Sequence, residues 1–426
     1  MINPAREDCH RLPFVFLLIF ILLASIARAE PHYTAIFGQS CGLCHVGPTG
    51  RGMRSLYGSQ FFGPTYLPVK PVTFEFLERI KPQLSESVII GADLRTIWLS
   101  ENTQIDTTEA GLSAPLSTNT GTISQMEGYL YLNLRPSDNF SLYYSQGVAQ
   151  SSGRFEMYGL VEGLPLHSFI KAGQFQENFG WAFADHTSFV RTGLFGSYDG
   201  TIIGIPSPPH YGVGAEVGLK PWKFDVSASF TNAQTSYPQA RDKQKRWFAR
   251  AQFQQGIEML GPQFTAGGSW YHAPYKAADP EYPFASPRLL RDEAWGGFGG
   301  LGWEGLEGTL GCTNGFGFLA SSAMFEYDRR AHVNPLAAGQ SPVTAAYSTG
   351  VLSTMIQPGI WLIGQYDWMD LGVPEMPDPQ AERTTLGLQI FPLPWVEVSP
   401  RYRLINNAAA ALRNQRQFEL QAHFFF

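Results

Sequence analysis

The sequence predicts a mainly β protein, an antiparallel transmembrane β-barrel of about 16 strands behind a short N-terminal segment. Three observations predict this fold. From Val88 onward, apolar and polar residues alternate with the two-residue period of strands that have two different faces. The chain closes with such an alternating stretch, and its last residue is Phe426. Aromatic residues make up 14% of the chain and charged residues only 15%, whereas about 25% charged residues is usual in soluble proteins.

The first 29 residues have the features of a secretory signal peptide. Arg6 and Arg11 precede an apolar run over residues 14–26, and residues 27–29 read Ala-Arg-Ala, a cleavage site. The run is too short for a membrane-spanning helix, which needs about 20 residues. No longer apolar stretch follows. We therefore expect an exported chain, beginning at Glu30, that crosses a membrane with strands.

Residues 41–45 read Cys-Gly-Leu-Cys-His, the C-x-x-C-H motif that attaches c-type haem. The thiols of Cys41 and Cys44 can add to the two vinyl groups, and His45 then lies beneath the iron as an axial ligand. A C-x-x-C pair alone also forms redox disulfides or half of a zinc site. Because no second C-x-x-C follows and the chain is exported, the motif predicts one c-type haem in a segment over residues 30–70.

Four neighbours of the motif are candidate haem contacts. Met53 and His32 are candidates for the sixth iron ligand; a methionine raises the haem potential and a second histidine lowers it. The alternative for Met53 is that it only packs on the haem face or on nearby glycines. Arg51 and Arg54 can neutralise the haem propionates through charge-assisted hydrogen bonds, or they are simply solvated.

A segment of this length is too small to form a core of its own. We therefore expect residues 30–70 to pack against the barrel mouth or inside it. Residues 71–87 are expected to be a linker, and residues 88–426 to form the barrel.

The alternation also predicts which side chains face the lumen. Polar members of the pattern, among them Glu216, Asp225, Arg401 and Arg403, are expected inside, and the apolar members are expected to face lipid. Outer-membrane barrels have short periplasmic turns and long outer loops. Short turns are expected near residues 136, 163, 221, 258, 305, 358 and 393, and long connections at 101–122, 176–209, 232–245, 273–293 and 330–342.

The stretch from Gly173 to Arg191 belongs to one of these long connections. It is long enough to fold into the pore as a constriction or to cap the outer mouth. In either case its polar residues could line a polar passage or bind a ligand: Glu177, Asp185, His186 and Arg191. The alternative is a solvated outer loop.

Composition excludes several function classes. The net charge is −6, and no basic stripe is available to neutralise phosphates, so nucleic acid is not an expected partner. No hydrolytic or group-transfer constellation is present. The chemistry expected of this chain is at most outer-sphere electron transfer at the haem edge.

The stretch CGLCHVGPTGRGMR, followed by a predicted barrel, resembles the fused monohaem cytochrome–porins of bacterial outer membranes, as in iron-oxidising bacteria. The resemblance implies that Cys41 and Cys44 carry the thioether links and that His45 is the proximal ligand. It also implies a barrel in outer-membrane lipid, with its haem segment on the periplasmic side or inside the lumen. The glycine-rich pattern C-x-x-C-H-V-x-P-T-G-x-G is similar as well to a looser group of porin-like proteins.

Three functions follow from these expectations. The first is electron transfer between extracellular donors or acceptors, iron among them, and a periplasmic c-type cytochrome or other carrier. The second is a diffusion porin for small polar solutes with a haem-bearing plug or redox gate. The third is a barrel scaffold that docks a multihaem partner. A filled lumen favours the first and an open lumen the second.

Overall fold

The computed structural model of the chain describes residues 32–69, 75, 81–105, 116–148, 155–181, 188–190, 197–198, 201–202, 211–232, 245–256, 262–277, 288–303, 320–333, 342–374, 379–407 and 415–426. The expected signal peptide and most of the expected linker lie outside these residues. Among them, no helix is both long enough and apolar enough to cross a bilayer.

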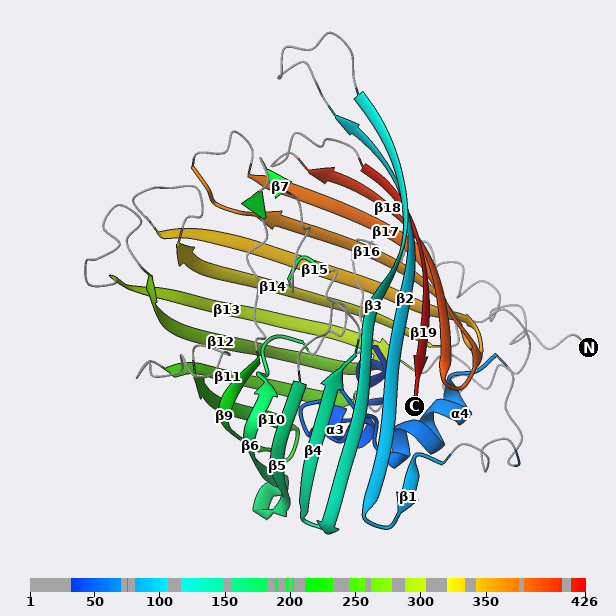
Figure 1. The fold of residues 1–426 in the computed structure, drawn as a ribbon, viewed down its shortest axis with the longest axis vertical. Coiled ribbons are helices and arrows are strands. Elements are labelled where there is room, and N and C mark those ends of the chain that lie inside the picture. The colour runs from blue at the N-terminus through cyan, green and yellow to red at the C-terminus, as the bar shows by residue number, and fades with distance from the viewer. Residues whose placement is uncertain are drawn as a thin grey trace, which may run out of the picture.

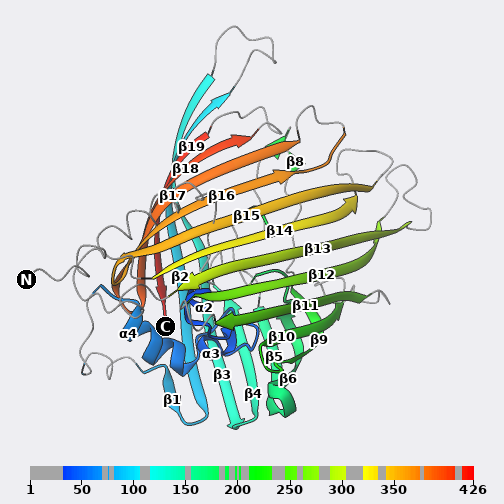
Figure 2. The same cartoon turned by 180° about the vertical axis from the view of Figure 1, so that it is seen from behind.

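Sixteen antiparallel strands within the described ranges close into one barrel (Figures 1 and 2). The strands are β2 (Val88–Ile105), β3 (Leu116–Ser137), β4 (Phe140–Gly147), β5 (Phe155–Leu164), β6 (Ser168–Gln176), β9 (Tyr211–Leu219), β10 (Phe224–Asn232), β11 (Lys245–Gly256), β12 (Gln263–Ala277), β13 (Arg288–Trp303), β14 (Ser321–Val333), β15 (Pro342–Gln357), β16 (Ile360–Asp370), β17 (Gln380–Leu393), β18 (Val396–Asn407) and β19 (Gln415–Phe425). The predicted fold class is confirmed.

The last strand closes the barrel on the first. β19 pairs with β2 from Gln415 opposite Thr103 to Phe425 opposite Asp93. The terminal residue continues the ladder, since Phe426 N donates to the Ala92 carbonyl at 3.0 Å. Closure leaves neither of these strands with a free edge along the seam, which is how a barrel satisfies its backbone polar groups in lipid.

The two faces of the wall divide as the alternation predicts. Apolar side chains on the outer face are exposed, for example Leu130 at 55% and Val217 at 51%. Polar side chains on the inner face are buried, among them Glu216, Arg401 and Arg403. This arrangement reverses that of a soluble protein and provides the apolar outer band that a bilayer requires.

One expected long connection is mostly strand. Residues 101–122 were predicted as a loop, but β2 continues to Ile105 and β3 begins at Leu116, with these two residues paired. The stretch is rich in threonine, which suits a pleated strand. Figure 1 shows the resulting β2–β3 hairpin rising beyond the rim of the neighbouring strands.

Shorter elements lie between the strands and before them. In the connection after β6, β7 (Ser197–Tyr198) pairs with β8 (Thr201–Ile202), and the turn after β5 contains the helical turn η3 (Pro165–His167). β1 (Gln83–Ser85) pairs with β2, inside the region expected to be a linker. Ahead of β1 lie the short helices α2 (His32–Phe37), α3 (Cys41–Cys44), η1 (Tyr57–Phe62) and α4 (Gly63–Tyr66).

Candidate functional site

Residues 32–69, called here the N-terminal segment, lie against the inner wall at the end of the barrel where the short turns are (Figures 1 and 2). Three hydrogen bonds tie the segment to these turns. Lys220 Nζ donates to the Pro48 carbonyl at 3.0 Å, and Trp395 Nε1 donates to the Ser59 carbonyl at 3.0 Å. The amide of Val69 donates to the Phe391 carbonyl at 2.9 Å.

Helix α2 packs on β13 at Gly302, a residue without a side chain. A β-carbon on Gly302 would lie 2.4 Å from the Ala35 carbonyl oxygen and 2.7 Å from the Ile36 nitrogen. Both Ala35 and Ile36 are fully buried. Gln254 Nε2 from β11 donates to the Thr34 carbonyl at 2.8 Å. The wall at Gly302 therefore leaves the space in which α2 packs.

The C-x-x-C-H motif forms one turn of helix and the start of a tight chain reversal. Cys41 and Cys44 begin and end α3, so their spacing of three places both thiols on one side. Gly50, Arg51 and Gly52 all have positive φ, and this left-handed run turns the chain back. His45 then pairs with Arg54 in an isolated β-bridge.

The reversal fixes the orientation of the His45 ring. Its Nδ1 donates to the Gly52 carbonyl at 3.2 Å, so this contact uses Nδ1 and not Nε2. Burial, and to a smaller extent the Arg54 guanidinium, lowers the pKa of His45 to about 4. A neutral imidazole with Nδ1 held by a backbone carbonyl is the form that binds a metal through Nε2.

The two cysteines are free thiols in a protected setting. Burial raises the pKa of Cys41 and of Cys44, which keeps both in the thiol form. Two thiols on one side of α3 and an oriented neutral imidazole form a donor set that fits a covalent haem. Within the described ranges, no group of three or more His, Cys, Asp or Glu side chains is arranged to hold a metal ion.

The other predicted haem contacts lie in different places. Met53 is buried in a cluster on the inner wall, and its Cγ lies 3.4 Å from a β-carbon built on Gly91. The Arg54 guanidinium lies 3.9 Å from the centre of the Phe425 ring. Arg51 Nη1 donates to the Glu177 carbonyl at 3.4 Å. His32 begins α2, and its side chain lies outside the described residues.

An aromatic cluster of the wall holds the reversal in place. The amide of Met53 donates to Tyr143 Oη at 3.2 Å, and the Tyr143 ring stacks on Tyr158 at 4.7 Å between centroids. Both tyrosines are buried.

Replacing this tyrosine by phenylalanine tests the contact. Tyr143→Phe keeps the ring stack but leaves a buried amide without its acceptor, at a cost of about 1–3 kcal/mol. We expect faster hydrogen exchange at the Met53 amide and unchanged exchange in β12 and β13. Equal exchange in the variant and the wild type would show that this bond does not hold the reversal.

The connection after β6 turns into the lumen. Residues 177–181 and 188–190, called here the inner loop, hydrogen-bond to the wall across several strands. Gly180 N donates to Ser269 Oγ at 2.8 Å, Trp181 N to Glu326 Oε2 at 3.0 Å, and Phe189 N to Asp367 Oδ1 at 3.3 Å. Of the two alternatives for this connection, its described part follows the first, folding into the pore. Asp185, His186 and Arg191 lie outside the described residues.

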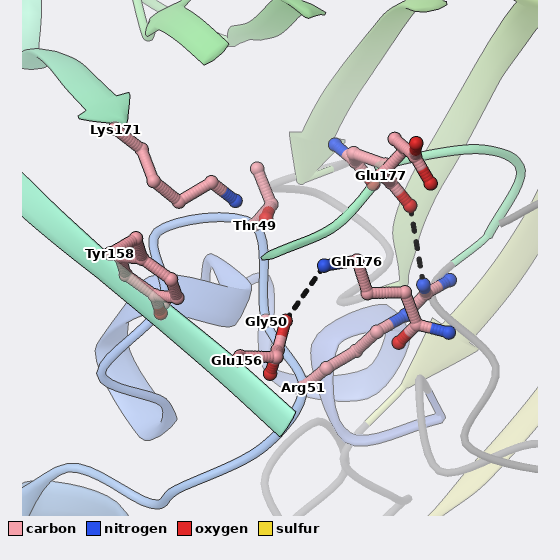
Figure 3. A pocket seen from close by; sticks show the side chains of 10 residues that line it. Thr49, Gly50, Arg51, Glu156, Tyr158, Lys171, Gln176 and Glu177 are labelled. Carbon is pink, nitrogen blue, oxygen red and sulfur yellow. Dashed lines mark hydrogen bonds between the residues drawn. The ribbon is translucent and has the colours of Figure 1, made fainter. Parts of the chain in front are cut away.

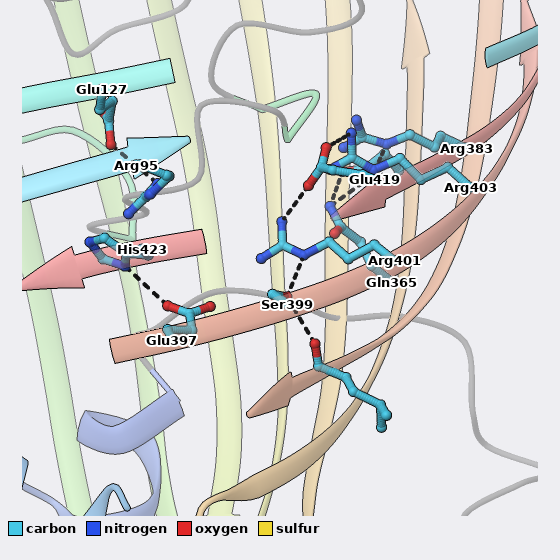
Figure 4. A network of polar contacts seen from close by, with 12 residues as sticks. Arg95, Glu127, Gln365, Arg383, Glu397, Ser399, Arg401, Arg403, Glu419 and His423 are labelled. Atoms are coloured by element: carbon cyan, nitrogen blue, oxygen red, sulfur yellow. Dashed lines mark hydrogen bonds and ion pairs between the residues drawn. The ribbon is translucent and has the colours of Figure 1, made fainter. Parts of the chain in front are cut away.

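Charged side chains of the inner wall are paired with one another (Figure 4). Arg401 and Arg403 both contact Glu419, at 3.3 and 2.8 Å. Of the other residues predicted to face the lumen, Glu216 pairs with Lys171 at 2.5 Å and Asp225 with Lys220 at 3.4 Å. Further pairs were not predicted, because no local sequence signal indicates them: Arg383 with Asp367, and His423 with Glu397 and Asp93.

A small cavity lies where the N-terminal segment, the inner loop and the wall meet (Figure 3). Its volume is about 20 Å³, room for about one or two water molecules. Arg51 and Glu177 line it together with Glu156 and Lys171 of the wall.

Comparison with known proteins identifies the fold and not the family. No protein-family model matches the chain, and no curated protein sequence matches it. The structure of Pseudomonas putida OprB has 11% identity and a TM-score of 0.57, covering 85% of this chain and 99% of that one. The chain has a porin fold. The structure of the anion-selective porin from Comamonas acidovorans has 9% identity and a TM-score of 0.53. That match covers 80% of this porin-like chain and 99% of the Comamonas chain.

The porin-like part of the predicted resemblance is thus confirmed at the level of fold. Neither neighbour is described as a cytochrome. The haem and its ligands stay predictions that rest on the motif and on the geometry around His45.

Proposed function

We propose that the protein is an outer-membrane diffusion channel for small polar solutes whose lumen is closed at the short-turn end by a haem-bearing N-terminal plug. The observation that carries the proposal is the way the N-terminal segment packs against the barrel wall. The segment is bound to the short turns and packs on a glycine of β13. The inner-wall charges beside it are buried and paired, as expected when a plug and an inner loop fill the lumen.

The outer surface supports a place in outer-membrane lipid. Many large apolar side chains of the strands are exposed, and Trp270 and Trp295 are among the exposed aromatics. In such barrels the short turns face the periplasm. The N-terminal segment, which lies at that end, would therefore be open to the periplasm.

The haem would be held by Cys41, Cys44 and His45. Bound there, it would supply a one-electron redox centre at the periplasmic mouth. The Gly52 carbonyl orients the His45 ring. Arg54 lies close enough to influence both Cys44 and His45 and is the better placed of the two arginines for a propionate. The buried seat of Met53 supports a packing role for that residue, with the sixth ligand left to His32 or to another group.

Electron transfer to the outside is the second candidate function. The presence of the N-terminal segment and the inner loop inside the barrel favours it, since both place protein in the lumen. Its difficulty is distance. A haem at the short-turn end leaves most of an apolar band of about 25 Å between itself and the outer surface. A periplasmic c-type cytochrome is the partner expected for either function.

Covalent haem is tested with the two cysteines. We expect the full chain, produced in a host that attaches c-type haem, to show a haem band after denaturing electrophoresis. Cys41→Ala with Cys44→Ala should abolish the band completely, because neither thioether can form. Barrel assembly should be unchanged, since the main contact of α3 is with η1 of the same segment. A wild-type chain without covalent haem contradicts the haem part of the proposal.

A membrane-impermeant reductant then separates the two functions. Added to intact cells, it should leave the haem oxidised until the outer membrane is permeabilised, if the haem faces the periplasm behind a closed plug. Rapid reduction in intact cells would instead support electron transfer across the membrane.

A further inference from the structure

A buried carboxylate lies beneath the N-terminal segment. Glu177, the first residue of the inner loop, has 0% of its surface exposed. Its Oε1 accepts a hydrogen bond from Thr231 Oγ1 at 2.7 Å and pairs with Arg246 at 3.1 Å. Its Oε2 is buried and has no hydrogen-bond donor. An ionised oxygen in such a position costs free energy that protonation removes.

The N-terminal segment contributes to this burial. Residues 47 and 49–51 line the same small cavity as Glu177 (Figure 3). Arg51 Nη1 donates to the main-chain carbonyl of Glu177 and not to its carboxylate. The segment therefore covers the carboxyl group without supplying the donor that the ionised form needs.

We propose that docking of the N-terminal segment takes up a proton on Glu177, so that acid strengthens the closed state of the lumen and higher pH weakens it. This inference rests on the segment being the plug of the proposed function, but it needs neither haem nor solute flux.

The charged surroundings agree with this direction. Burial, with a smaller contribution from Glu216, raises the pKa of Glu177 to about 7 against the lowering effects of Arg246 and Thr231. Arg246 belongs to β11, Thr231 to β10 and Glu216, with its partner Lys171, to the wall as well. These groups belong to the wall and not to the segment. The segment itself adds burial and the Arg51 guanidinium, whose positive charge opposes proton uptake, but burial is the largest influence on the pKa of Glu177.

The sign follows from proton binding. The docked state holds a proton on Glu177 up to about pH 7, whereas an exposed glutamate releases it near its ordinary value of 4.5. Because the docked state binds more protons in this window, docking is strongest below it. Docking weakens as the pH rises through the window and is constant above it.

Hydrogen exchange of the amides in residues 46–53 measures docking directly. The full chain is compared at pH 5 and pH 8, with each rate referred to the intrinsic exchange rate at that pH. We expect the protection of these amides to fall by about tenfold or more between the two values. Glu177→Gln, which keeps the shape and removes the charge, should give high protection at both.

The control variant is Glu127→Gln. Glu127 also pairs with an arginine of the wall, Arg95, but more of its side chain is exposed, at 21%. This variant should keep the wild-type pH dependence. Protection that does not change with pH in the wild type, or a dependence that survives in Glu177→Gln, overturns the inference. Neither result depends on whether the channel conducts, so the proposed function stands or fails separately in conductance measurements.

Discussion

Replacing Gly302 by leucine is expected to open the lumen. A β-carbon there would lie 2.4–2.7 Å from backbone atoms of Ala35 and Ile36, which cannot give way as a flexible side chain can. Helix α2 must therefore leave its seat. Because the same segment reaches the short turns through Pro48 and Ser59, we expect the whole plug to loosen. Single-channel conductance in planar bilayers should rise severalfold.

The matched control is Gly364→Leu. Gly364 lies on β16, and a β-carbon there meets nothing within 4 Å. This variant should conduct like the wild type, and both variants should run as folded barrels on electrophoresis without heating. A Gly302→Leu protein that is folded but conducts like the wild type would show that the N-terminal segment does not limit the passage of ions.

The barrel could be predicted because the facing of a strand residue is a local property. Successive side chains point to opposite sides, so the two-residue period alone assigns Leu142 to lipid and Glu216 to the lumen. The closing strand and the approximate number of strands follow from the same period. Strand ends are less well determined, because a threonine-rich stretch such as 116–122 suits a strand and a polar loop equally.

The haem motif could be recognised in the sequence for a similar reason, since its five residues are contiguous. The contacts that position the N-terminal segment and the inner loop in the barrel could not be predicted from the sequence. Trp181 and Glu326 are 145 residues apart, and Phe189 and Asp367 are 178 apart. Gly302 is one glycine among 44, and nothing local marks it as the seat of α2. Such pairings depend on the register and closure of the whole barrel.

Asp367 is expected to be the most sensitive residue of the inner wall. Its carboxylate is fully buried on β16 and accepts hydrogen bonds from Thr349 Oγ1 at 2.7 Å and Arg383 Nε at 2.9 Å. Its Oδ1 also accepts from the amide of Phe189 in the inner loop at 3.3 Å. One side chain therefore neutralises a buried arginine and attaches the inner loop to the wall.

Asp367→Ala should lower the free energy of unfolding by about 3–5 kcal/mol, because it leaves the Arg383 guanidinium buried without its partner. Urea titration in lipid vesicles measures the loss. Asp370→Ala is the control, since Asp370 lies on the same strand but is only partly buried and accepts from the Gly372 amide; a loss of about 1 kcal/mol is expected.

A second substitution separates the two roles of Asp367. In Asp367→Ala with Arg383→Met, no buried charge is left unpaired, so most of the lost stability should return. The Phe189 amide, however, still has no acceptor, and residues 188–190 should keep an increased rate of hydrogen exchange. If the double variant restored the slow exchange as well, the inner loop would be held by packing around Phe189 and Trp181 and not by the carboxylate.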